Sequence, residues 1–168
     1  MSIVANQLAD RIQEGATTLA NFVRELNDAQ WKVIVPRDGR TVGVIVHHVA
    51  SMYPIELGVV QMAVDGKAIT DVTWEVVADI NAKHAKEMAG VGKAEALELL
   101  ARNSLDAARA IRKLTDADLT RAVPFSLSFG APMTVQFIIE DHPLRHPWHH
   151  LARIKAALRA IDATSVAA

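Results

Sequence analysis

Apolar residues recur at intervals of three and four along most of this sequence, and that spacing constrains the fold more than any other feature. In a helix, residues spaced this way line one face, which has to be buried against another element. The spacing predicts four long amphipathic helices, over residues 2–26, 42–64, 93–114 and 133–161, and a shorter one over 73–89. We therefore expect an all-α, antiparallel four-helix bundle with the shorter helix in the crossover between the second and third long helices.

The length and composition fit one globular domain. The chain has 168 residues, of which 51% are hydrophobic and 22% charged, so it can bury a sizeable core. We expect a single helical domain over residues 1–162 and a frayed tail over 163–168. The alternating residues 125–129 are compatible with a short extended segment.

Several classes of protein are disfavoured by the same composition. A net charge of −1 lacks the basic surplus of a nucleic-acid-binding protein. The absence of cysteine excludes disulfides and thiolate metal sites. We find no secretory signal and no uninterrupted apolar run near the ~18 residues that span a bilayer. We therefore expect a cytoplasmic protein whose partners include neither nucleic acid nor membrane.

Histidines occupy helix positions where aliphatic side chains should face the core. The apolar stripe that ends at Ile161 continues backward, turn by turn, through His150, His146 and His142. His48 lies on the corresponding stripe of the helix over 42–64, whereas its neighbour His47 points about 100° away. The other members of that stripe, which we expect to face the core, are Ile45, Met52, Ile55, Val59 and Met62. Burying neutral imidazole rings without partners costs free energy, so these positions need an explanation.

A shared metal ion would explain these buried histidines, because each ring nitrogen then gains a strong bond. Two histidines four residues apart reach one ion from the same side, and a third ring from a facing helix completes a site with an open position. His48, His146 and His150 are therefore candidate ligands of a divalent ion. Such sites accept zinc, nickel, iron and copper, so the sequence does not name the metal. The alternative is that these are hydrogen-bonded core residues.

Other polar residues near these apolar stripes are weaker candidates for a role in the site. Glu56 lies two turns beyond His48 and is either a catalytic base or a surface carboxylate. Asp141 and His149 are candidates to orient the ligand rings, although Asp141 equally suits a helix cap and His149 equally suits an exposed position. His84 has charged neighbours, so we expect a solvated side chain.

Two segments resemble the signatures of the DinB/YfiT-like proteins. Residues 38–50 resemble the family's second-helix motif, in which a histidine precedes an aliphatic and a small residue. Residues 146–154 resemble its last-helix signature, in which two histidines four apart precede a polar residue and an isoleucine or leucine. Segments 26–31 and 114–119 fit the family's layout as well, so the resemblance covers essentially the whole chain.

The resemblance implies an up-down-down-up bundle and a metal held by His48, His146 and His150, with water completing its coordination. The family includes metal-dependent enzymes that use low-molecular-weight thiols: mycothiol-dependent maleylpyruvate isomerases and bacillithiol transferases. The chain departs from the usual pattern at Pro143 and Pro147, which should kink the last helix or make it restart near Asp141.

Two functional hypotheses follow. In the first, the protein is a metal-dependent thiol transferase, hydrolase or isomerase, in which the ion activates a thiol or water toward a small electrophilic substrate. In the second, it is a binding or scaffold protein with no enzymatic activity, either metal-bound or metal-free. We expect a homodimer in either case.

Overall fold

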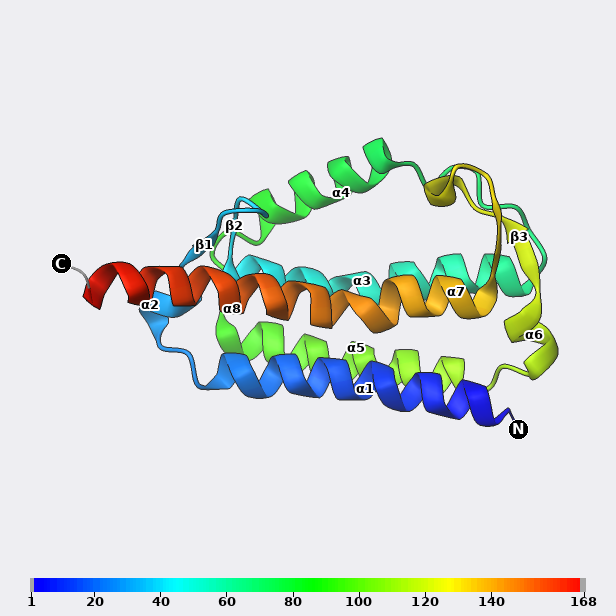
Figure 1. Ribbon diagram of the computed structural model, residues 1–168, viewed down its shortest axis with the longest axis horizontal. Coiled ribbons are helices and arrows are strands. Elements are labelled where there is room, and N and C mark those ends of the chain that lie inside the picture. Colours follow the sequence, from blue (N-terminus) through cyan, green and yellow to red (C-terminus); the bar gives the residue numbers. More distant parts are fainter. Residues whose placement is uncertain (1, 167–168) are drawn as a thin grey trace.

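The four expected long helices are present and form an antiparallel bundle in the computed structural model, which describes residues 2–166. They are α1 (Ile3–Arg24), α3 (Val42–Val64), α5 (Lys93–Ile111) and a final helical run that ends with α8 (Arg145–Val166). Figure 1 shows that α3 and α5 run parallel to each other and antiparallel to α1 and α8. The bundle and its up-down-down-up order are thereby confirmed.

The shorter helix α4 (Trp74–Glu87) makes this order possible. It returns along the outside of α3, so that α5 starts at the same end of the bundle as α3 (Figure 1). Thr73 caps α4 by accepting a hydrogen bond from the Val76 backbone N–H. None of the side chains of α4, all within the described part of the chain, is buried. The crossover helix therefore lies on the bundle without contributing to its core.

Short elements connect the helices. They are α2 (Asp28–Trp31), α6 (Asp116–Thr120), the antiparallel pair β1 (Ile34–Val35) and β2 (Arg40–Thr41), and the antiparallel pair β3 (Ala122–Pro124) and β4 (Pro132–Thr134). The extended segment expected over 125–129 is wrong in position, because Ser126–Ser128 forms a 3₁₀ turn between β3 and β4. The chain reverses there through Phe129 and Gly130, both with positive φ (58° and 79°).

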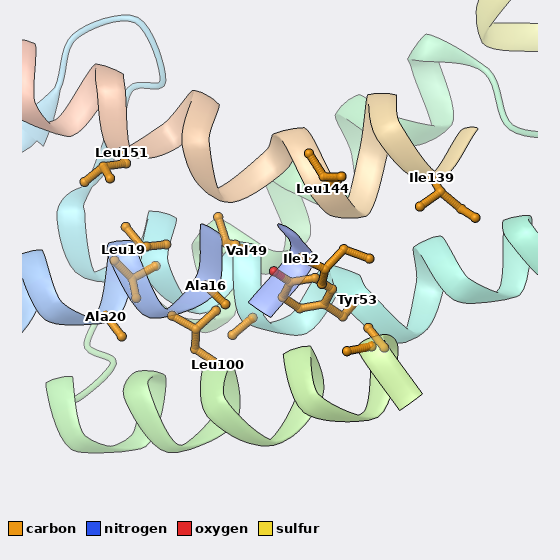
Figure 2. Close-up of a cluster of buried hydrophobic side chains, with 14 of the residues drawn as sticks. Ile12, Ala16, Leu19, Ala20, Val49, Tyr53, Leu100, Ile139, Leu144 and Leu151 are labelled. Atoms are coloured by element: carbon orange, nitrogen blue, oxygen red, sulfur yellow. The ribbon is translucent and has the colours of Figure 1, made fainter. Parts of the chain in front are cut away.

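The core lies between α1, α3, α5 and the final helical run. Figure 2 shows Ile12 and Leu19 of α1 packed near Val49 and Tyr53 of α3 and Leu100 of α5. The α1 stripe predicted from the sequence is buried over its whole length in the helix. Its apolar spacing of three and four accounts for this directly.

The inward face of α3 differs from the predicted stripe beyond His48. Ile55 is 47% exposed and Met62 is 36% exposed, whereas Tyr53 and Val60 are buried. Because α3 is apolar almost all round, periodicity does not decide which face enters the core. The helix is long and apolar enough to cross a membrane by length and composition, but 61% of its apolar window is buried, as a core helix requires.

The final helical run passes its two prolines without breaking. It consists of α7 (Val135–Ile139), a π-helical turn over Glu140–Leu144 and α8. Pro143 lies within the π turn, whose altered hydrogen-bond pattern accommodates a residue without an N–H. The expected restart near Asp141 is therefore replaced by a local widening. The helix continues to Val166, and residues 167–168 of the expected tail lie outside the described part of the chain.

Candidate metal centre

The fold brings His48 of α3 together with His146 and His150 of α8. One ring nitrogen of each lies within 4.8 Å of the other two. The ring centroids are 4.9 Å apart for His48 and His146, 5.5 Å for His48 and His150, and 4.9 Å for His146 and His150. We call these residues the three-histidine group. The spacing of four on α8 puts two rings on one face, and the packing of α3 against α8 supplies the third.

Burial keeps the rings of His48 and His150 neutral. His48 and His150 are buried, and His146 is half-buried. Burial, reinforced by the neighbouring His146, lowers the pKa of His48 to about 2, and the same two causes lower the pKa of His150 far below its usual range. A neutral imidazole has a lone pair on one ring nitrogen. His48 and His150 therefore each offer an electron-pair donor at neutral pH.

Unpartnered polar atoms are concentrated here. Among the residues that the structure describes, the buried Nδ1 atoms of His48 and His150 have no hydrogen-bond partner. Leaving buried polar atoms unpaired is unfavourable, and such atoms mark a site for water or an ion. Three imidazole nitrogen donors suit zinc, nickel, iron or copper rather than magnesium or calcium, which prefer oxygen ligands. The group could thus hold a divalent metal ion.

Glu56 lies beside this group and is buried, with 8% of its surface exposed. The alternative interpretation of Glu56, as a surface carboxylate, is therefore wrong. Its Oε1 is 2.9 Å from His146 Nδ1, and its Oε2 has no hydrogen-bond partner among the described residues. The turn of α3 that buries Tyr53 also directs Glu56 inward, toward α8.

Asp38 is a site residue that no pattern in the sequence singles out. Its side chain is 3% exposed, and its Oδ1 lies 3.7 Å from His150 Nδ1 and 2.9 Å from Arg153 Nη1. Arg40 Nη2 approaches the same oxygen at 3.3 Å. The signal in the sequence was the polar residue Arg153, one turn beyond His150, but only the packing of the β1–β2 turn against α8 makes Asp38 its partner.

Two expected orienting residues have different contacts. Asp141 Oδ1 lies 3.1 Å from Arg145 Nη2, and its Oδ2 lies 3.7 Å from His142 Nδ1. No contact between Asp141 and the three-histidine group is found within the described chain. His149 does approach the group, with its ring edge-on to His150 at a centroid distance of 5.2 Å.

His84 is not solvated as expected. Its Nε2 lies 2.8 Å from Nδ1 of His47, and the two rings stack with centroids 5.0 Å apart. The return of α4 along α3 creates this contact, which no local pattern in the sequence reports. The pair joins the crossover helix to the bundle next to the three-histidine group.

A cavity of about 380 Å³ opens in front of the three-histidine group, between α3, α4 and the final helical run. Glu56, His142 and His149 line it together with the three-histidine group. Its volume lies in the range of small-molecule sites. A ligand in the cavity would therefore lie against the candidate metal ligands.

Comparison with known proteins agrees with this description. The sequence pattern of the DinB superfamily matches residues 11–154. No curated protein matches the chain. Among solved structures, YfiT from Bacillus subtilis, described as a probable metal-dependent hydrolase with an unusual four-helix bundle topology, superposes with a TM-score of 0.77. The two are 18% identical, over 96% of this chain and 90% of that one; at this identity the likeness establishes the fold.

Proposed function

The chain belongs to the DinB superfamily, and from that premise we propose that it is a metal-dependent hydrolase whose ion is held by His48, His146 and His150. One observation carries the proposal: three histidine rings from two helices converge at the wall of a cavity, and the Nδ1 atoms of His48 and His150 have no hydrogen-bond partner among the described residues. The description of YfiT as a probable metal-dependent hydrolase supports the same reaction class.

The donor set fits a catalytic rather than a structural ion. Structural zinc is usually held by four protein ligands, whereas catalytic zinc is held by three and keeps a position open. A divalent ion bound here would supply a Lewis acid that lowers the pKa of a water molecule. Neither Glu56 nor Asp38 is needed as a ligand, so both are free to act on the rings.

Glu56 is suited to orient His146. A carboxylate that accepts a proton from one ring nitrogen fixes the tautomer and leaves the lone pair on the other nitrogen. The separation of 2.9 Å between Glu56 Oε1 and His146 Nδ1 is right for this. Asp38, at 3.7 Å from His150 Nδ1, would act more weakly on the second ring. We assign both as positioning residues.

Hydrolysis is preferred to thiol transfer because of the cavity. Transfer from a low-molecular-weight thiol requires room for a second, polar reactant beside the substrate. The cavity of about 380 Å³ has an extensive apolar lining that includes Met52, Val59 and Phe125. Water needs neither the space nor additional polar contacts, which supports it as the nucleophile.

The test combines metal analysis with turnover. Protein purified without a histidine tag is analysed for metal, and hydrolysis of a panel of esters and amides is measured before chelation, after chelation and after metal is restored. We expect about one ion per chain, activity that follows the metal, and no requirement for added thiol. Turnover that needs a thiol would identify a transferase. A protein without bound metal or activity would favour the non-enzymatic alternative.

A further inference from the structure

An apolar wall lines the cavity in front of the three-histidine group. On α3 it includes Met52, Ile55 and Val59, which the sequence predicts as core residues. All three line the cavity, and Val59 also packs against the core. On α4 it includes Val77 and Ile80. The helix α4 contributes no buried residue, although it carries this apolar surface. Packing of the bundle core therefore does not explain why these positions between α3 and α4 are apolar.

The charges around the cavity are internally compensated. Its described lining holds three arginines and three carboxylates. Asp38 lies 2.9 Å from Arg153 and 3.3 Å from Arg40. The third arginine, Arg145, lies 3.1 Å from Asp141. Arg40 and Arg153 share Asp38, and Arg40 Nη1 has no hydrogen-bond partner among the described residues. With three arginines and three carboxylates, the lining still carries no net charge that would favour an anionic ligand.

We propose that the cavity takes an uncharged, mainly apolar substrate of about a dozen non-hydrogen atoms, with its apolar body between α3 and α4. The size follows from the cavity of about 380 Å³ and from a share of about 30 Å³ per water-sized group. The polar, reacting end of the substrate meets the three-histidine group. Only the role of that end depends on the proposed hydrolysis; the apolar subsite follows from its own lining.

Binding of linear alcohols tests the subsite without any reaction. The affinities of n-alkanols from butanol to dodecanol are measured by calorimetry on the full chain, both as purified and after chelation. Each buried methylene is worth about 0.8 kcal/mol, so we expect affinity to rise about two- to fourfold per carbon and to level off near a dozen atoms. An affinity that does not depend on chain length, in either form of the protein, would overturn the proposal.

The charge of the ligand provides a second measurement. In the chelated protein, an n-alkanoate should bind at least tenfold more weakly than the alkanol of the same length, because the lining has no net positive charge to offset the desolvation of a carboxylate. Equal or tighter binding of the alkanoate would show that the arginines are available to anions, and would refute the preference for an uncharged substrate.

Substitutions on α3 locate the subsite. Val59→Phe fills part of the cavity and should shorten the longest alkanol that still gains affinity. Val59→Gln should flatten the dependence on chain length. Met62, on the same helix, is 36% exposed and lies outside the lining, so Met62→Phe and Met62→Gln are matched controls. If the Val59 and Met62 variants behave alike while melting normally, the alkanols bind elsewhere and the proposal is wrong.

Metal-dependent hydrolysis and the apolar subsite can each fail without the other. If no metal binds or no ester is hydrolysed, the proposed reaction fails, but the dependence on chain length should persist in the chelated protein. If hydrolysis follows the metal but alkanols bind without any dependence on length, the reaction stands and the apolar subsite is rejected.

Discussion

Replacing Glu56 with glutamine removes one charge next to the three-histidine group while keeping the side-chain shape. Glu56 is buried, and its Oε1 lies 2.9 Å from His146 Nδ1. The amide oxygen of glutamine can still accept a hydrogen bond from that nitrogen. The substitution therefore tests the negative charge itself rather than the packing of α3 against α8.

The substitution should lower the affinity for metal without lowering the free energy of unfolding of the metal-free chain. Loss of a carboxylate that orients a metal-bound histidine typically lowers metal affinity about 10- to 100-fold, or about 1.4–2.7 kcal/mol. In the chelated protein the same carboxylate is buried, and its Oε2 has no hydrogen-bond partner among the described residues. A neutral amide costs less to bury than a charge, so the free energy of unfolding should stay the same or increase.

Two measurements check this pair of effects. Competition with a chromophoric chelator gives the metal affinity, and denaturant unfolding in excess chelator gives the stability of the metal-free chain. Glu87→Gln is the matched control, because Glu87 forms a surface pair with Lys83 on α4 and is 53% exposed. A metal affinity within twofold of the parent protein would refute the role assigned to Glu56. A clear loss of stability in chelator would show that Glu56 is structural.

Alanine in place of any member of the three-histidine group should reduce bound metal well below one ion per chain by elemental analysis, while His47→Ala retains it; the reverse pattern would mean that the ligand is His47. Chelation should lower the melting temperature without unfolding the protein at room temperature, because the aliphatic core does not depend on the ion; loss of the helical circular dichroism would contradict this. Burial lowers the pKa of His48 to about 2, against about 6.5 in the unfolded chain. Below pH ~6.5 the unfolded state therefore binds more protons, and the chelated protein should lose up to about 1.4 kcal/mol per pH unit from this residue; constant stability from pH 7 to 5 would be inconsistent with a buried neutral ring. Gly43→Ala should destabilise by about 1–3 kcal/mol, because a Cβ there would lie 2.6 Å from Trp31 Nε1. Gly58→Ala, with nothing within 4 Å of its Cβ, should stabilise by about 0.5–1 kcal/mol, and similar effects in calorimetry would exclude the close contact as the cause.

Local sequence patterns determined the helices and, within the site, the convergence of His146 and His150. The bounds of α3 follow from the Thr41 cap, which accepts a hydrogen bond from the Val44 N–H, and from the Asp65-Gly66 stop. The inward face of α1 follows from its spacing, because α1 has a distinct polar face to contrast with it. The convergence of His146 and His150 follows from helix geometry alone, since residues four apart share a face.

The rest depended on tertiary packing. The sequence of α3 is apolar almost all round, so only its neighbours decide that Tyr53 enters the core while Ile55 faces the cavity. The widened turn at Pro143 depends on how the surrounding helices hold the backbone. The partners Asp38 of His150 and His84 of His47 come from segments far away in the chain. Periodicity shows which residues share a face of one helix or strand. A contact between two elements depends on how they pack against each other. The contacts of Asp38 with His150 and of His84 with His47 were therefore found only in the folded structure.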